Sequence, residues 1–413
     1  MTIKISKPKF NIREKLSELD KPSGLKGNEL MRSDTTQDAR DLVSAGRKNM
    51  IINGAMTINQ RNDTSSYTIP HGTGGSYGGP DRWAVNESTD GSISVNMDGD
   101  PAGGNGAGTD VQEFTKAFQL ACTGTATLSS GHNTHFFQNI EGYNIANLGW
   151  GTMSAKPVTL SFWVKTNKAG IYAVGLENNA PDRCCIRDYY QSGNFKWNKV
   201  VLTFPGCTDG TWLQTDGCGM RVRFCLASGV QYDNGVDGEW VNSDNLCTTK
   251  SQVVNFMDST NNRFMITGVQ LEVGENATEF EHRSHSEELS LCQRYFAIFP
   301  GRSGGIPFWQ CYMGSSSGYC SIPVPNFNFR IVPTPTDKTT GTSSSSGNMY
   351  DVGGANIKSN FTGNGTVTLS CGGYAPSGIG LIMNFGTHNS GDKDGVVASW
   401  NGATPGIFLD AEL

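Results

Sequence analysis

The sequence predicts an all-β protein built from antiparallel sandwiches, and three observations indicate this fold class. Short runs in which apolar and polar residues alternate recur along the chain, and a period of two is typical of strands with one buried face. Glycine supplies 52 of the 413 residues and charged residues only 17%, as expected for many short strands joined by tight turns. Long helical patterns are absent outside the N-terminus. Because a single core rarely organises 413 residues, we expect two or three domains.

Residues 1–48 form a predicted arm that differs from the rest of the chain, because its charged residues are dense and its apolar residues recur at helical spacing. Ile12, Leu16 and Leu19 fall on one face of a first short helix, and a second helical pattern covers residues 34–46. Two helices of this size cannot build a core alone, so we expect the arm to pack on a partner chain or on symmetry mates. A flexible leader is the alternative interpretation. The polar start of the sequence does not match a secretory signal.

Residues 49–285 carry the strands of one predicted sandwich. The pattern turns to strands at Asn49, and Asn53 followed by glycine is a strong turn signal. Further alternating runs are Ile93–Met97, Leu160–Val164, Tyr172–Leu176, Val200–Phe204, Met220–Leu226 and Phe264–Val273. In the run that ends at Leu226, Arg221 and Arg223 occupy the face opposite the apolar residues. Strands of this length with turn-rich spacers predict an antiparallel sandwich.

Residues 286–413 predict a second, smaller β-sandwich. It opens with a short helical pattern at Ser286, where Glu287 and Glu288 occupy positions that favour negative charge. Alternating strands follow at 295–299, 367–371, 379–385 and 407–409, with proline-ended and aromatic-rich strands near 307–325. The stretch 338–348 is a low-complexity loop.

The stretch Asn262–Phe296 joins the two predicted sandwiches and also carries a resemblance. Its sequence ITGVQLEVG, followed by ATEFEHRSHSEELSLCQRYF, resembles the closing motif of a family of bacteriophage fibre proteins, in a version seen in fibres of cyanophages and related phages. At Gly268 the parity of the apolar positions becomes ambiguous, which predicts a β-bulge. The resemblance extends to KNMIINGAMTINQR (Lys48–Arg61), to DRW (Asp81–Trp83) and to KPVTLSFWVKTNKAGIYAVGLEN (Lys156–Asn178), so it covers most of residues 1–296.

This resemblance implies a jelly-roll topology like that of carbohydrate-binding domains, and a trimeric virion fibre without enzymatic activity in the sandwich. We expect residues 1–48 to dock on a tail, neck or capsid protein, and residues 286–413 to trimerise and face the host. The expected partners are two further copies of the chain and a host-surface glycan, and the expected location is the virion, assembled in the host cytoplasm. A purely structural decoration or adaptor protein is the first alternative, and a glycan-cleaving tailspike is the second.

Aromatic side chains are the candidate receptor contacts, because sugars are held on flat aromatic platforms beside amide or acidic groups. Trp309, Tyr312 and Tyr319 cluster in sequence, and Trp400 lies in a second segment that mixes aromatic and polar residues. Inter-sheet packing is the alternative role for these residues, and it is the favoured one for Trp163.

Catalytic and metal-binding patterns are weak in this sequence. Acidic residues gather in glycine-rich loops, where solvation explains them without catalysis; these residues are Asp98, Asp100, Asp233, Asp237, Glu239, Asp392 and Asp394. The loop 233–239 leaves calcium binding open, although its spacing is not that of an EF-hand. His132 and His135 are interpreted as an ordinary strand-edge pair, since zinc would need two more ligands. The glycines at 71–79 lack the Lys-Ser/Thr and helix of a phosphate loop. No cofactor is expected.

Charge, hydropathy and cysteine usage argue against several further classes of protein. A net charge of −6 gives no basic surface for nucleic acid, and no apolar run approaches the roughly 18 residues of a membrane span. The 11 cysteines are odd in number, irregular in spacing and without a CxxC pair, so we interpret most of them as small buried residues of a chain folded in a reducing compartment.

Overall fold

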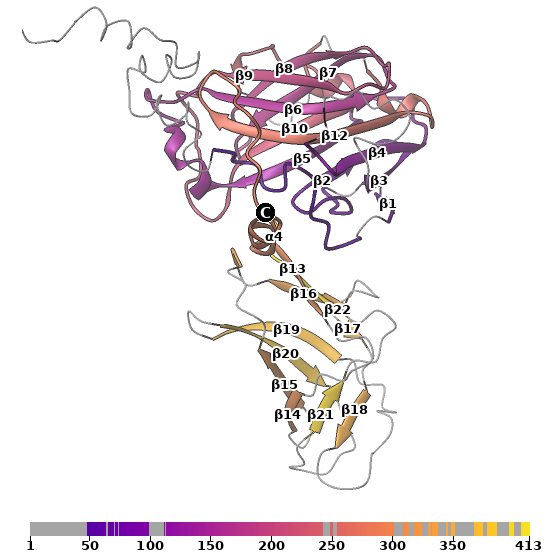
Figure 1. Ribbon diagram of the computed structural model, residues 1–413, viewed down its shortest axis with the longest axis vertical. Coiled ribbons are helices and arrows are strands. Elements are labelled where there is room, and N and C mark those ends of the chain that lie inside the picture. Colours follow the sequence, from indigo (N-terminus) through magenta and orange to yellow (C-terminus); the bar gives the residue numbers. More distant parts are fainter. Residues whose placement is uncertain are drawn as a thin grey trace, which may run out of the picture. The chain divides into compact units, whose positions relative to one another are not determined.

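The computed structural model describes residues 48–62, 65–69, 71–72, 74–98, 111, 113–242, 248–250, 254–300, 309–313, 318–323, 329–331, 333–337, 344–345, 348–351, 367–374, 378–385, 396–399 and 406–413 (Figure 1). The chain divides into two compact units, Met1–Lys48 and Asn49–Leu413. Ile12, Leu16 and Leu19, the residues predicted for virion docking, lie outside the described residues.

The predicted all-β fold is confirmed: two six-stranded antiparallel sheets form a jelly-roll-like sandwich (Figure 1). Sheet A has the strand order β1-β3-β4-β12-β6-β9, and sheet B the order β11-β8-β7-β10-β5-β2. The strands of sheet A are β1 Tyr67–Thr68, β3 Ser92–Asp98, β4 Ala117–Gly124, β6 Val158–Thr166, β9 Asn198–Phe204 and β12 Arg263–Val273. Those of sheet B are β2 Ala84–Glu87, β5 Asn133–Glu141, β7 Gly170–Glu177, β8 Cys184–Gln191, β10 Cys218–Ser228 and β11 Trp240–Val241.

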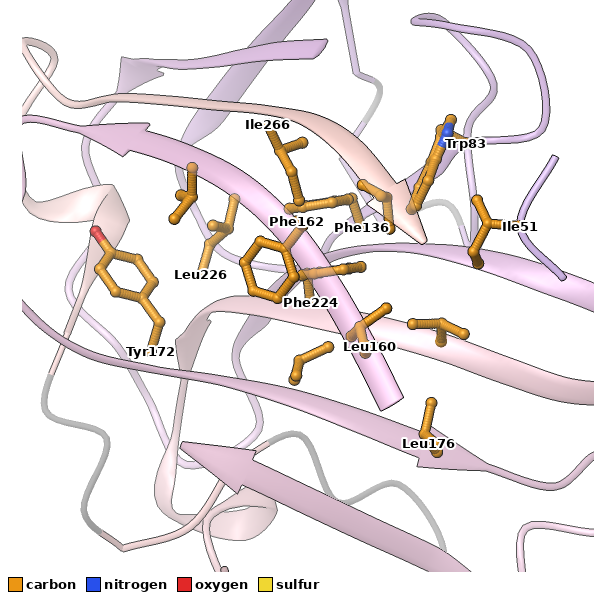
Figure 2. Packing of buried hydrophobic residues seen from close by; sticks show 14 of the residues in the cluster. Ile51, Trp83, Phe136, Leu160, Phe162, Tyr172, Leu176, Phe224, Leu226 and Ile266 are labelled. Carbon is orange, nitrogen blue, oxygen red and sulfur yellow. The ribbon is translucent and has the colours of Figure 1, made fainter. Parts of the chain in front are cut away.

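The core lies between the two sheets and is centred on aromatic rings (Figure 2). Phe136 of β5 and Phe224 of β10 stack with their ring centroids 4.8 Å apart and their planes 1° from parallel. Phe162 of β6 meets Phe224 edge-on at 5.2 Å, so sheet A contacts sheet B through complementary ring geometry. Each of these fully buried side chains stabilises the sandwich by about 1.5–3 kcal/mol.

The bulge predicted at Gly268 is present in β12. The register with β6 shifts between Thr267 and Gln270, and Gly268 has a φ of +61°. A Cβ atom at this position would come within 2.5 Å of the Phe114 ring, so both the backbone angle and the close approach require glycine. The bulge explains why the apolar positions change parity along this strand.

The polar residues of the closing motif tie the segment after β12 back onto sheet A. Gln270 accepts a hydrogen bond from the backbone N–H of Glu281 at 2.8 Å, and Glu272 accepts bonds from the N–H and hydroxyl of Thr278 at 2.8 and 2.6 Å. The Glu281 carboxylate in turn accepts a bond from the backbone N–H of Asn49 at 2.7 Å. The motif is therefore structural, because its buried polar groups satisfy one another.

The strand predicted from Asn49 is not formed, although the Asn53-Gly54 turn is. The side-chain oxygen of Asn53 accepts bonds from the backbone N–H groups of Thr57 and Ile58 at 2.9 and 3.0 Å. Its amide donates to the carbonyl of Ile58 at 2.8 Å. Because this side chain satisfies the local backbone groups, the segment folds as a buried irregular loop and not as part of a ladder.

The helix predicted near Ser286 is α4, His285–Gln293, capped by the Ser284 hydroxyl. Beyond it lie a three-stranded antiparallel sheet, β13-β22-β16, and a seven-stranded antiparallel sheet, β17-β19-β20-β15-β14-β21-β18. Their bounds are β13 Phe296–Pro300, β14 Trp309–Met313, β15 Gly318–Pro323, β16 Thr334–Asp337, β17 Ser344–Ser345, β18 Asn348–Asp351, β19 Val367–Tyr374, β20 Gly378–Phe385, β21 Val396–Ser399 and β22 Gly406–Asp410. Among the described helices, none is both long and apolar enough to span a membrane.

Candidate functional site

A cleft of about 340 Å³ lies on the face of sheet B that points away from the core. It is built on three neighbouring strands, β2, β5 and β10, and on loops at their ends. Polar and aromatic side chains share its lining, which consists of Gly74, Asn86, Ser88, Gly131, Asn133, His135, Phe137, Arg221, Arg223 and Tyr232.

The strand register explains why these residues meet. Arg223 of β10 is opposite Phe137 of β5, and His135 of β5 is opposite Asn86 of β2. Successive residues of a strand point to opposite faces, so these side chains share the outer face while Phe136 and Phe224 face the core. The floor of the cleft is therefore formed by the paired strands of sheet B.

Two arginines of the cleft share one buried carboxylate, that of Glu177 on β7. Nη1 of Arg221 and Nη2 of Arg223 lie 2.7 and 2.5 Å from the same Glu177 oxygen, Oε1. Nε of Arg221 donates to the Asn139 side chain at 2.8 Å, and its guanidinium lies 4.9 Å from the centre of the Phe137 ring. The Arg221 side chain is 30% exposed and that of Arg223 is 6% exposed, so Arg221 is the more accessible cation. Two guanidinium groups against one carboxylate give this part of the cleft a positive character.

Amide and hydroxyl groups line the part of the cleft nearest β2. The Asn86 amide donates to the Asn133 side-chain oxygen at 2.7 Å, and Ser88 exchanges bonds of 2.9 and 3.1 Å with the Asn133 backbone. The side-chain oxygen of Asn86 and the amide nitrogen of Asn133 take no part in the bond between them. These two groups can present one acceptor and two donors to a ligand.

Aromatic groups complete the lining. Tyr232 stands on the 3₁₀ turn η4, Val230–Tyr232, which is fixed by a 3.0 Å bond from the Gln231 N–H to the Ser130 carbonyl. Phe137 lies under the loop that precedes β2, where a Cβ atom at Gly75 would come within 3.0 Å of its ring. A half-buried tyrosine on a fixed turn is a suitable platform for a flat ligand face.

The two histidines are not the strand-edge pair that the sequence suggested. His135 is buried in β5, which lies between β10 and β2, and its ring packs 5.7 Å from that of Phe137. His132 precedes β5, and its Nδ1 accepts a 3.2 Å bond from the Ser129 N–H. The separation arises because β5 begins at Asn133, between the two residues.

Carboxylates do not line the described part of the cleft. The ten described residues of its lining include no aspartate or glutamate. In the loop 233–239, Asp237 accepts bonds from the Arg187 side chain and the Asp188 N–H at 3.1 and 3.0 Å. No group of three potential metal ligands is found within the described ranges. Of the other acidic residues singled out above, Asp98 is placed only by its backbone, and Asp100, Asp392 and Asp394 lie outside the described residues.

The seven cysteines whose side chains the structure describes are all buried. Burial raises the pKa of Cys185 to about 12 and that of Cys218 to about 11, which keeps both thiols protonated near neutral pH. Within the described chain these residues therefore act as small packing groups.

The aromatic residues predicted for receptor contact are placed only in part. Tyr312 of β14 and Tyr319 of β15 are direct partners in the strand register, and Trp309 of β14 is opposite Ala398. Trp400 lies outside the described residues. Their role in receptor contact stays a prediction.

No protein-family model matches the sequence, and no curated protein matches it. Solved structures with some similarity include the enzymatically active domain of tailspike protein 4 of bacteriophage CBA120, at 12% identity and a TM-score of 0.27. That match covers 55% of this chain and 21% of the tailspike chain, so this chain spans about a fifth of the tailspike's length.

Two further similar structures are described as carbohydrate-binding modules. The family 11 module of a cellulosomal cellulase of Clostridium thermocellum has 11% identity and a TM-score of 0.25, and covers 48% of this chain and 91% of that one. The CBM22 tandem domain of Paenibacillus barcinonensis Xyn10C has 10% identity and a TM-score of 0.23, and covers 86% and 100%. With TM-scores this low, the cleft is interpreted from its own residues.

Proposed function

We propose that the chain is a glycan-binding protein of a phage virion fibre and that a host-surface saccharide binds in the cleft on sheet B. The main support for this proposal is the cleft. Its volume of about 340 Å³ falls within the usual range for small-ligand sites, which is roughly 300–1,000 Å³. Its floor is held by three paired strands, which limits the reorganisation that binding requires.

The lining suits a saccharide because a sugar ring offers an apolar face and a rim of hydroxyl groups. Tyr232 supplies an aromatic surface for the ring face, and the amides of Asn86 and Asn133 supply both donors and acceptors for hydroxyls. The neighbouring arginines donate further hydrogen bonds. Recognition at such an open site is weak for each copy, and several copies on one particle raise it to useful avidity.

The assignment to a virion fibre rests on the motif resemblance in residues 48–296. In this proposal residues 1–48 dock on a phage protein, and three chains assemble into one fibre. The C-terminal strands that carry Trp309 and Tyr319 form a second host-facing surface. The protein then acts on the virion after assembly in the host cytoplasm.

Binding without cleavage is proposed for the cleft because glycoside hydrolysis ordinarily uses two carboxyl groups on either side of the bond. No carboxyl group is found among the lining residues that the structure describes, and the nearby Glu177 is occupied by two arginines. The side chains present can hold and orient a sugar, but they do not supply the acid and the nucleophile or base.

A glycan array tests this function when product release is measured on the same glycans. The full chain should bind a subset of the array and release no shorter sugar. Tyr232→Ala should weaken that binding roughly 2- to 10-fold through loss of ring contact. Tyr190→Ala is the matched control, because Tyr190 is 67% exposed on β8 of the same sheet but does not line the cleft.

Three results would contradict the proposal. Absence of binding across the array would favour a purely structural decoration protein. Release of product would favour a cleaving tailspike. Equal losses in the Tyr232 and Tyr190 variants would place the glycan outside the cleft.

A further inference from the structure

Three contacts fix the guanidinium of Arg221 at the cleft. Nε donates to Asn139 at 2.8 Å, Nη1 donates to Glu177 at 2.7 Å, and the plane lies 4.9 Å from the Phe137 ring centre. Its remaining nitrogen, Nη2, makes no hydrogen bond to the part of the chain that the structure describes. A guanidinium fixed in this way loses little conformational entropy when it binds an anion.

The carboxylate beside Arg221 does not fully neutralise it. Glu177 Oε1 accepts from both Arg221 and Arg223, so Arg221 shares this carboxylate with a second cation. The described residues of the lining add no carboxylate. This positive site lies in a chain of net charge −6, so an anion is attracted locally, within the Debye length of about 8 Å, and not by the protein as a whole.

We propose that the cleft selects acidic saccharides and that Arg221 binds the carboxylate of a uronic acid unit. This inference rests on the proposed function and specifies the class of glycan. A carboxylate carries a full negative charge, so it forms a stronger hydrogen bond with the remaining Nη2 group than a neutral hydroxyl does. The amides of Asn86 and Asn133 then contact hydroxyls of the same or the adjacent ring.

The test compares uronate oligosaccharides with their methyl esters, which keep the ring and remove the charge. The panel contains galacturonate, glucuronate, mannuronate and guluronate oligomers, their methyl esters, neutral hexose oligomers and a dextran sulfate oligomer. Binding to the full chain is measured by calorimetry at 50 and 200 mM salt. At least one uronate should bind about 10- to 100-fold more tightly than its ester, as expected for a charge-assisted hydrogen bond, and higher salt should weaken it.

Variants test whether Arg221 causes the preference for the acid over the ester. Arg221→Gln should remove the preference for the acid over the ester. Arg221→Lys should retain part of this preference, because lysine keeps the positive charge but lacks the planar set of N–H donors of a guanidinium. Arg187→Gln is the control of equal charge change, since Arg187 pairs with Asp237 and does not line the cleft. Thermal unfolding checks that each variant is folded, and Glu177 keeps Arg223 as a partner when Arg221 is changed.

The outcomes separate this inference from the proposed function. Neutral sugars or esters that bind as well as the acids would overturn the selection of acidic saccharides and leave glycan binding intact. Preference for the sulfate would overturn the assignment to a carboxylate. An unchanged preference in Arg221→Gln would overturn the role of Arg221. Failure of every glycan, here and on the array, would overturn the proposed function itself.

Discussion

Replacing Glu412 with alanine should destabilise the sandwich, because the Glu412 carboxylate neutralises a buried arginine. The Arg82 side chain is 1% exposed and donates through Nη1 to Glu412 Oε2. Its Nη2 donates to the Asn139 carbonyl at 2.6 Å, and its guanidinium lies 3.5 Å from the centre of the Tyr295 ring. A second arginine, Arg61, reaches Glu412 Oε1 at 3.4 Å. The last residues of the chain thus complete a charge network on the first sandwich.

The size of the effect follows from burial. Removing one partner of a buried ion pair costs about 3–5 kcal/mol, because the other charge is left without compensation. At roughly 2–4 °C per kcal/mol, the melting temperature should fall by about 6–20 °C. Glu412→Gln should cost less, because its amide oxygen still accepts a hydrogen bond. Glu113→Ala is the matched control: Glu113 is 48% exposed and lies 3.5 Å from His282, so its removal should cost less than about 1 kcal/mol.

Urea unfolding and calorimetry on the full chain provide the assay, with the three variants measured beside the unmodified protein. The expected order of stability is unmodified, Glu113→Ala, Glu412→Gln and then Glu412→Ala. If Glu412→Ala unfolds with the same midpoint as Glu113→Ala, the Glu412 carboxylate does not neutralise Arg82.

Four further predictions concern assembly, docking, adsorption and pH. Native mass measurement should show a homotrimer, and a stable monomer at micromolar concentration would contradict a fibre. Deletion of residues 1–48 should leave the melting temperature of the sandwich unchanged and abolish incorporation into particles; particles that still carry the truncated chain would place docking elsewhere. Trp309→Ala and Trp400→Ala should lower adsorption to cells at constant trimer stability, whereas a parallel loss of stability would make them packing residues. Burial tends to raise the pKa of Glu141, but hydrogen bonds from Arg294 and Tyr295 outweigh this effect and hold the pKa below its ordinary value. The ionised Glu141 carboxylate therefore stabilises the fold above about pH 4, and this stabilisation is lost as the pH falls through the folded-state pKa. Glu141→Gln should make the stability depend less on pH in this acidic range. An unchanged pH dependence of unfolding would contradict this role of Glu141.

Several strands could be predicted from the sequence because only one of their faces is apolar. β6, β7, β9, β10 and β12 were all predicted from this alternation, and so was the bulge at Gly268. β5, with the sequence NTHFFQNIE, was missed because all nine of its residues are buried and the outer face carries buried polar groups as well. A strand with apolar residues on both faces shows no period of two in its polarity.

The cleft could be anticipated only in part. The sequence placed Arg221 and Arg223 on the face opposite the core, and the structure confirms this. Their partner Glu177 is 44 residues before Arg221, and only the register between β7 and β10 brings the two side chains together. Register depends on long-range pairing, so the alternation within one strand does not determine it. Asn86 and Tyr232 likewise come from segments that only the folded sheet brings together.

A crystal structure of the full chain with the saccharide that binds most tightly on the array would show where the glycan binds. We expect one saccharide on the outer face of sheet B, with a ring against Tyr232 and a charged group on Nη2 of Arg221. A saccharide bound elsewhere on the chain while the cleft stays empty would contradict this expectation.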